Sequence, residues 1–196
     1  MKLPLFPLNA VLFPGCRLDL QIFEARYLDM ISRCMKQGTG FGVVTIGEGR
    51  EVGEAPSRLA MVGCEASVRD WQQPNGLLGI RVEGGRRFQV LSVEVQADQL
   101  SVGEIEWFED LPEQPLTYEH NDLAALLSVL AEHPMVAALE MGGEPGGQQD
   151  LANQLAYLLP FDTERKLELL ALPDAQMQLA RIQVLLEHLQ GELGID

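Results

Sequence analysis

A few arginines in the first half of the chain are its strongest candidates for chemistry. Arg86 and Arg87 follow Gly84-Gly85 at the start of an apolar segment, and Arg81 comes shortly before them. Because guanidinium groups make paired, charge-assisted hydrogen bonds to carboxylates and phosphates, this cluster is a candidate site for an acidic ligand. The alternative is structural, with one arginine bonded to backbone carbonyls and the other facing solvent.

Arg26 is a further candidate, because it follows Glu24 closely at the start of an expected helix. Glu24 suits the first turn, where a negative charge interacts favourably with the helix dipole. Arg26 either pairs with an acidic residue across the junction of two subdomains or reaches a ligand. We keep it as a candidate binding residue.

The thiols and imidazoles do not have the spacing of a metal site. Zinc needs closely spaced ligand pairs, whereas the cysteines and histidines are scattered and form no Cys-x-x-Cys motif. They are Cys16, Cys34, Cys64, His120, His133 and His188. We therefore expect buried free thiols, no metal and no cofactor.

Two other kinds of catalytic group are not expected either. A nucleotide-binding loop ends in Gly-Lys-Ser/Thr, and none of the three lysines follows a glycine-rich loop. Carboxylates are abundant, but general acid–base catalysis needs a cleft and a shifted pKa. Glu104 and Glu106 share one face of an expected strand, and we expect them to face solvent.

Three large apolar side chains are candidates for binding a partner. Trp71 comes just before a turn sequence at 73–76, so it either is exposed at a hairpin tip, as a hot spot would be, or folds back on the sheet. Met135 and Met141 precede a glycine-rich loop, where flexible methionines suit an apolar groove for peptide.

The first hundred residues are predicted to be mainly β-structure. Strand-like segments occur at 41–46, 59–66, 77–82, 88–95 and 102–107. Turn sequences separate them at 73–76 and 83–86, where glycine and asparagine tolerate positive φ. Alternation predicts that Val93 and Val95, and likewise Ile105 and Trp107, face a core.

One helix is predicted within this β-rich part. Apolar residues from Phe23 to Gln37 follow one helical stripe, and Gly38 is suited to end it. After residue 110 the periodicity becomes helical, in segments at about 123–130, 135–141, 151–159, 163–172 and 174–190.

Capping residues accompany the later helices. Asp150, and either Asp162 or Thr163, are expected N-caps, and Gly191 is expected to end the last helix. The predicted fold class is therefore α+β: a β-rich subdomain over 1–110 with an inserted helix at about 23–37, then a helical subdomain over 111–196.

Size and charge limit the class of protein. A chain of 196 residues can bury a sizeable core without disulfides or metals. Its formal net charge is −15, and only three basic residues follow residue 109, so we do not expect nucleic acid as a partner. No apolar segment approaches the roughly 20 residues that span a bilayer, and the N-terminus lacks signal-peptide features. We expect a cytoplasmic protein.

The opening residues resemble a known family. They read Leu-Pro-Leu-Phe-Pro-Leu at 3–8, Leu-Phe-Pro-Gly at 12–15, Leu-Asp-Leu at 18–20 and Ile-Phe-Glu-Ala-Arg-Tyr at 22–27. This pattern is similar to the start of the Lon protease N-terminal domain, in its free-standing version. Weaker matches at 41–44, 85–88, 158–162 and 166–170 extend the resemblance over nearly the whole chain.

The resemblance implies both a fold and a function. The family's fold is a PUA-like β-rich pseudo-barrel followed by a helical bundle, which agrees with the predicted order of elements. Its role in Lon proteases implies binding of unfolded or degron-bearing polypeptide, and an adaptor role in protein quality control beside a protease or chaperone. The alternatives are a small-ligand or RNA-binding PUA-like module, or an enzyme of unknown type.

The catalytic parts of a Lon protease are not expected here. The Lon peptidase uses a serine with a lysine as base, and Ser128 and Lys166 are a pair that the composition allows. Ser128, however, lies among leucines of a predicted helix, where a packing role is favoured, and the Lon serine motif is absent. We expect a non-enzymatic binding protein.

Overall fold

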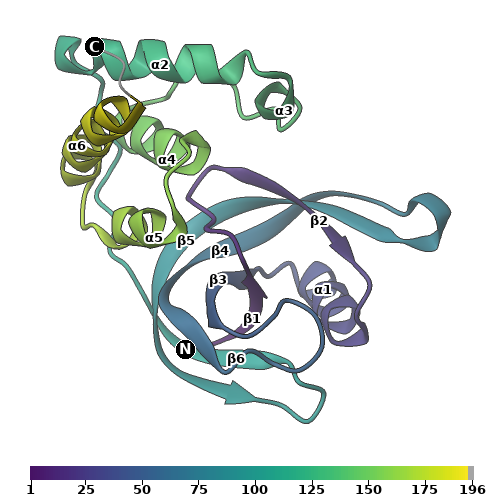
Figure 1. The fold of residues 1–196 in the computed structure, drawn as a ribbon. Helices are drawn as coiled ribbons and strands as arrows, with labels where there is room; N and C mark the ends of the chain where they lie inside the picture. Colours follow the sequence, from purple (N-terminus) through teal and green to yellow (C-terminus); the bar gives the residue numbers. More distant parts are fainter. Residues whose placement is uncertain (194–196) are drawn as a thin grey trace. The chain divides into compact units, whose positions relative to one another are not determined.

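The first part of the chain is built from six strands and one helix. The strands are β1 (Lys2–Leu8), β2 (Arg17–Ile22), β3 (Phe41–Glu48), β4 (Arg58–Gln72), β5 (Leu78–Val95) and β6 (Ser101–Trp107). The computed structural model describes residues 1–193 and divides the chain into two compact units, Met1–Glu109 and Asp110–Asp196. Each unit is described by itself (Figure 1).

Five of the strands close into a barrel. The sheet order is β2-β5-β4-β3-β1-β6, and β6 pairs again with β5, which closes the ring. The β1–β3 pair is parallel, whereas the other pairs are antiparallel. The first part of β5 pairs with β2 and its last part with β6, so β2 lies outside the ring. The predicted α+β fold with a pseudo-barrel is confirmed.

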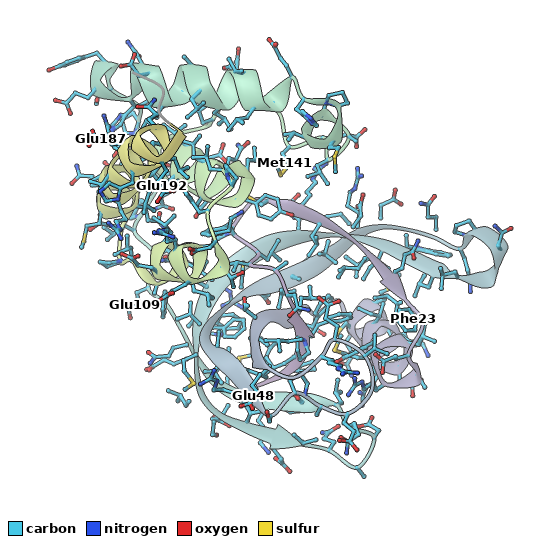
Figure 2. All side chains as sticks on the ribbon, in the orientation of Figure 1. Phe23, Glu48, Glu109, Met141, Glu187 and Glu192 are labelled. Carbon is cyan, nitrogen blue, oxygen red and sulfur yellow. The ribbon has the colours of Figure 1, made fainter. Side chains whose placement is uncertain are left out.

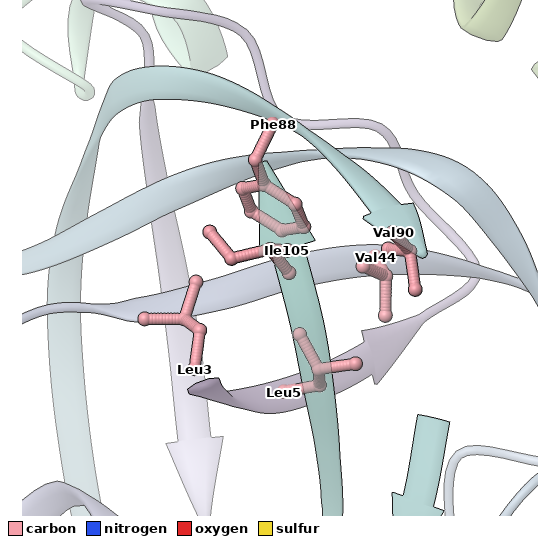
Figure 3. Close-up of a cluster of buried hydrophobic side chains, with 6 residues drawn as sticks. All are labelled: Leu3, Leu5, Val44, Phe88, Val90 and Ile105. Atoms are coloured by element: carbon pink, nitrogen blue, oxygen red, sulfur yellow. The ribbon is translucent and has the colours of Figure 1, made fainter. Parts of the chain in front are cut away.

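The barrel interior holds a tight apolar cluster around Phe88. The cluster consists of Leu3, Leu5, Val44, Phe88, Val90 and Ile105 (Figure 3). Trp107 meets the Phe88 ring edge-on, with 5.9 Å between the ring centroids. A Cβ at Gly63 would lie 2.4 Å from the Phe88 ring, so this glycine makes room for the aromatic side chain. Ile105 and Trp107 therefore pack as predicted.

Two predictions about β5 were wrong. The glycines Gly84-Gly85 form no turn, because β5 runs through them as one long strand. Gly84 is needed for close approach instead, since a Cβ there would lie 2.1 Å from the carbonyl oxygen of Phe13. Val93 and Val95 are 41% and 48% exposed rather than buried. An alternating sequence shows that a strand has an apolar and a polar face, but it does not show that another element packs on the apolar face.

Helix α1 (Ala25–Gln37) lies within the barrel unit, as predicted. Gly38 ends it in the left-handed conformation, with φ at 65°. The helix begins two residues later than expected, so Phe23 precedes it and is 58% exposed. The buried stripe of the helix is consequently shorter than predicted, and Phe23 is not part of it.

The second unit is helical. Its helices are α2 (Asn121–Ala131), α3 (Pro134–Ala137), α4 (Gln148–Leu158), α5 (Thr163–Ala171) and α6 (Ala175–Leu193). Buried leucines from α2, α4, α5 and α6 form its core, among them Leu127, Leu151, Leu155, Leu169 and Leu185. None of the helices in residues 1–193 has the length and hydropathy of a bilayer-spanning segment.

Side-chain caps set several of these helix starts. Asp162 accepts the N–H of Arg165 at 2.8 Å, and this bond holds the pKa of its carboxyl below the usual value. Asp150 is not the N-cap of α4; it lies inside the first turn and accepts the N–H of Gly146. Gly191 does not end α6, since a single glycine weakens a helix without stopping it.

Replacing Asp174 by alanine is expected to destabilise the helical unit by about 1 kcal/mol. Its Oδ1 accepts the N–H of Met177 at 2.9 Å, where α6 begins. Urea unfolding followed by circular dichroism at 222 nm measures the change. The matched control is Asp174→Asn, which caps equally well and should leave the unfolding midpoint unchanged. Equal midpoints for all three proteins would contradict the assignment of this cap.

Candidate functional site

The barrel unit has a pocket of about 290 Å³ beside β2. We call it the β2 pocket; its lining comes from β1, from residues 19–22 of β2, from Phe23, Glu24 and Tyr27 around the start of α1 and from residues 51–52 of the β3–β4 loop. β2 is the terminal strand in the sheet order, and no β5 residue lines the pocket in the described chain. It is therefore bordered by a strand edge.

The floor of the β2 pocket is apolar. Phe6 and Leu8 of β1, Ile22 of β2 and Tyr27 of α1 are all buried there. The rings of Phe6 and Tyr27 stack with 4.2 Å between their centroids, and burial raises the pKa of the Tyr27 hydroxyl. These contacts hold β1 against α1 and give the pocket a rigid base.

Two large apolar side chains are exposed at the rim of the β2 pocket. Phe23 is 58% exposed and Val52 is 55% exposed. Figure 2 places Phe23 where the chain passes from β2 into α1. Exposed apolar groups above an apolar floor are typical of a site that buries a partner's side chain.

The charged residues of the β2 pocket are all acidic. Asp19, Glu24 and Glu51 line it, and no lysine or arginine stands among its lining residues in the described chain. Arg81 holds Asp19 through two bonds of 2.7 and 2.9 Å, which lower the pKa of that carboxyl. Glu51 accepts the backbone N–H of Asn9 at 2.7 Å. Arg26 lies 3.1 Å from the Glu24 carboxylate, so two of the three pocket carboxylates are paired with arginines. None of the described residues that line the pocket is a lysine or arginine that could attract a phosphate or a carboxylate.

Arg26 is a structural residue of this region. Its guanidinium is buried, donates to the carbonyl of Gln99 at 2.8 Å and lies 3.1 Å from the Glu24 carboxylate. It also lies over the Tyr27 ring. These contacts tie the start of α1 to the turn between β5 and β6. The pairing predicted for Arg26 exists, but within the barrel unit.

The other arginines do not form one anion site. Arg81 binds Asp19, while Arg86 binds Glu65 at 3.2 Å and lies over the Trp107 ring at 3.8 Å. Arg87 is buried, with its guanidinium over the Phe108 ring. Each guanidinium thus has its own protein partner. Arg86 is exposed and Arg87 is buried, and a binding role for either residue stays a prediction.

None of the predicted apolar candidates is among the residues that line the β2 pocket. Trp71 is 55% exposed near the end of β4, where it pairs with Ile80 beside the predicted turn. Asn75 and Gly76 of that turn have φ values of 54° and 79°. Met135 is 77% exposed in α3, and Met141 is half-buried in the following loop of the helical unit. Their role in binding stays a prediction.

Ser128 and Lys166 have separate partners in the helical unit. Ser128 donates to the carbonyl of Ala124 one turn earlier, at 3.1 Å, and it is exposed rather than packed in the core. Lys166 donates to the carbonyl of Tyr157. In the described chain Cys16, Cys34 and Cys64 are buried and form no disulfide. Within residues 1–193, no three metal-ligating side chains gather as a metal ion would require.

The helical unit has a second pocket of about 320 Å³. Thr117, His120, Gln148 and Gln183 give it a polar lining. Gln148 donates to the carbonyl of Pro115 at 2.8 Å and is largely buried. None of the described residues that line this pocket is an exposed large apolar side chain. The pocket therefore provides less apolar surface for a bound polypeptide than the β2 pocket does.

The sequence did not reveal the β2 pocket. Its parts come from four segments, and none of the candidate residues chosen from the sequence lines it. Phe23 was assigned to the helical stripe, although the acidic Glu24 after it marks a helix start. The one local signal for the exposed Phe23 ring was that a large apolar residue stands just before a helix start.

Comparison with solved structures defines the class of protein. The chain is similar to the Lon N-terminal domain protein from Xanthomonas campestris, with 33% identity, a TM-score of 0.74, and coverage of 94% of this chain and 98% of the other. It also has the fold of the N-terminal domain of the Mycobacterium avium complex Lon protease, at 17% identity and a TM-score of 0.57, over 95% and 97% of the two chains. The barrel and helices are therefore a Lon N-terminal fold.

The family follows from the sequence match. The model of the ATP-dependent protease La (LON) substrate-binding domain matches residues 2–188. The chain belongs to this family, and its molecular class is that of a substrate-binding module. No peptidase or ATPase domain is found within the matched sequence.

Proposed function

We propose that this chain binds unfolded or degron-bearing polypeptide without catalysing a reaction, and that the β2 pocket holds an apolar side chain of the bound segment. The observation that carries the proposal is the pairing of exposed Phe23 and Val52 with a buried apolar floor. Membership of a substrate-binding family supports it. An adaptor role in protein quality control and a cytoplasmic location belong to the same proposal.

The charge of the site supports polypeptide over RNA. The β2 pocket is lined by carboxylates, and the arginines that were candidates for binding an anion are engaged with protein groups. Nucleic-acid binding depends on free lysine and arginine side chains facing the phosphates. The net charge of −15 acts in the same direction.

Binding of an unfolded protein tests the proposal directly. The probe is reduced, carbamidomethylated lysozyme carrying a fluorescent label, with binding followed by anisotropy. Native lysozyme is the matched control, because it has the same sequence and nearly the same charge but is folded. We expect binding of the unfolded form only. Equal binding of both forms, or of neither, would overturn the proposal.

Replacing Phe23 and Val52 together by serine is expected to weaken this binding at least tenfold, which corresponds to about 1.4 kcal/mol. The reason is that each rim side chain loses apolar area that the bound segment would cover. Both residues are exposed, so the urea midpoint of the barrel unit should stay unchanged.

The matched control for this pair is Tyr118→Ser with Val129→Ser, which removes an exposed aromatic and an exposed valine from the helical unit. This control should bind as the wild type does. Separate alanine variants of Trp71, Met135 and Met141 test the sites predicted from the sequence. If these weaken binding while the Phe23 and Val52 variant does not, the site lies there instead.

A further inference from the structure

The pocket of about 320 Å³ in the helical unit is lined by a buried side chain with an unused acceptor. We call it the Gln148 pocket. Its lining comes from Thr117, Glu119 and His120 before α2, from Leu123 of α2, from Gln148 of α4 and from one face of α6. Because α4 packs against both α2 and α6, all these parts belong to one packed unit (Figure 1).

The Gln148 side chain is only 7% exposed and is held in one orientation. Its Nε2 donates to the carbonyl of Pro115 at 2.8 Å, and a carbonyl can only accept, so the amide group cannot be turned over. Oε1 accepts no hydrogen bond from any residue that the structure describes. Because buried acceptors are normally satisfied, an unused one in the lining of a pocket indicates that a donor of a ligand belongs there.

A carboxylate lines the same pocket. Glu119 is exposed and forms no ion pair with any residue in the described part of the chain. Hydrogen bonds hold the turn that carries it, since the N–H of Thr117 donates to Nδ1 of His120 at 3.0 Å and the N–H of His120 donates to the carbonyl of Thr117 at 3.0 Å. The pocket therefore has an unpaired negative charge on a well-fixed turn.

The charge of the helical unit favours a cationic ligand. No lysine or arginine stands among the described residues that line the Gln148 pocket. Residues 110–196 include fifteen acidic side chains but only three basic ones, Arg165, Lys166 and Arg181. Each of these three already binds another group of the same unit. A cation is therefore attracted to this unit, whereas a phosphate or a carboxylate is repelled.

The remaining lining suits a planar cation on an alkyl stem. Leu123 and Leu179 are buried and give the pocket an apolar part, while Gln176 and Gln183 add carboxamides from α6. A guanidinium has five N–H donors in one plane and no acceptor, and it is more weakly hydrated than an ammonium. Its stem can cover the leucines while its head donates to the unused acceptors.

We infer that the Gln148 pocket binds a guanidinium group on an alkyl stem, with Gln148 Oε1 and the Glu119 carboxylate as its acceptors. The group belongs either to a free small molecule or to an arginine side chain of a polypeptide, and both sources share this chemistry. A volume of about 320 Å³ is at the small end of ligand pockets and suits one such group. This site goes beyond the proposed function, whose pocket lies in the barrel unit.

Titration of butylguanidinium into the ¹⁵N-labelled full chain tests the inference by NMR. We expect saturable shifts of the Gln148 side-chain amide and of the backbone amides of Thr117 and His120, with millimolar affinity or tighter. Butylammonium has the same charge and stem without the planar set of donors, so it should bind at least fivefold more weakly. Equal binding of the two cations, or shifts without saturation, would overturn the inference.

Glu119→Gln should weaken butylguanidinium binding at least fivefold, because it removes the charge and keeps the shape of the side chain. Glu132→Gln is the matched control. It removes the same charge from an exposed position at the other end of α2, outside the pocket lining, and should change binding less than twofold. Equal weakening by both variants would show general attraction to an acidic surface and would overturn the site.

Gln148→Leu removes the buried acceptor and should abolish detectable binding of butylguanidinium. Circular dichroism at 222 nm shows whether this variant keeps its helices, since the bond to Pro115 is lost as well. A folded variant that binds as the wild type does would overturn the role of Gln148. If the variant unfolds, the Gln148 side-chain shift in the wild type and the pair of glutamate variants still decide the question.

An acetylated and amidated Gly-Arg-Gly peptide distinguishes the two sources of the guanidinium. If the peptide shifts the same resonances and competes with butylguanidinium, an arginine of a polypeptide can occupy the site. If butylguanidinium binds and the peptide does not, the ligand is a free small molecule. If neither binds, the inference is overturned.

Discussion

Gly84→Ala is expected to lower the free energy of unfolding of the barrel unit by more than about 4 kcal/mol, an exceptional loss for one methyl group. The added Cβ would lie 2.1 Å from the carbonyl oxygen of Phe13 and 2.8 Å from its carbonyl carbon. Both are backbone atoms, so no side-chain rotation can relieve the clash. The main chain of residues 13–16 must move away from β5.

That movement would break further contacts. The N–H of Gly84 donates to the carbonyl of Cys16, and its own carbonyl accepts the N–H of Gly15, both at 2.8 Å. Phe13 and Cys16 are fully buried and would be displaced with the segment. The same segment leads into β2, so the register of β2 against β5 depends on this contact as well.

The neighbouring glycine provides a matched control. The atoms nearest to a Cβ at Gly85 all belong to Glu65, with its side-chain Oε2 at 3.4 Å and its backbone oxygen at 3.7 Å, which are ordinary contacts. Gly85→Ala should therefore be neutral or stabilise the strand by up to about 1 kcal/mol. Tryptophan fluorescence in urea follows the barrel unit, because Trp71 and Trp107 both belong to it. A Gly84→Ala midpoint equal to that of Gly85→Ala would contradict the proposed clash.

The order of elements could be predicted from the sequence, because it depends on local periodicity. The β-rich part, the inserted helix ending at Gly38 and the later helices were all predicted. The role of Gly84-Gly85 within a continuous strand was not predicted. A turn and a close approach of two backbone segments both require glycine, so the local sequence looks the same in the two cases. Only the distant partner, Phe13, distinguishes the two cases.

The candidate site was much harder to predict than the fold. Arg86 and Arg87 stand out in the sequence, but ion pairs and ring contacts within the barrel unit account for them. The β2 pocket depends on β1 and the β3–β4 loop meeting beside β2, which follows from the barrel closure.

Glu24→Gln is expected to cost the barrel unit about 3 kcal/mol, because it removes the charge that compensates a buried guanidinium. Arg26 has a side chain only 4% exposed, with the Glu24 carboxylate 3.1 Å away. The remaining partners of the guanidinium are the Gln99 carbonyl and the Tyr27 ring, and neither carries a charge. The glutamine keeps the shape of the side chain, so the change is electrostatic.

A double variant separates this charge effect from lost packing. In Glu24→Gln with Arg26→Met the buried cation is gone as well, and an apolar side chain of similar length fills its place, so most of the stability should return. Arg26→Met alone should cost less than Glu24→Gln, because the Glu24 side chain is 20% exposed and its carboxylate can be hydrated.

The readout is again tryptophan fluorescence in urea, with the coupling energy taken from the double-mutant cycle. Additive losses in the double variant would show that Glu24 and Arg26 act separately. Coupling of 2 kcal/mol or so would establish the pair as the link between α1 and the β5–β6 turn. Because Glu24 also lines the β2 pocket, the stable double variant removes one pocket carboxylate while keeping the fold. Its binding of unfolded lysozyme then measures how much the Glu24–Arg26 ion pair contributes to affinity, because the carboxylate and the guanidinium are removed together.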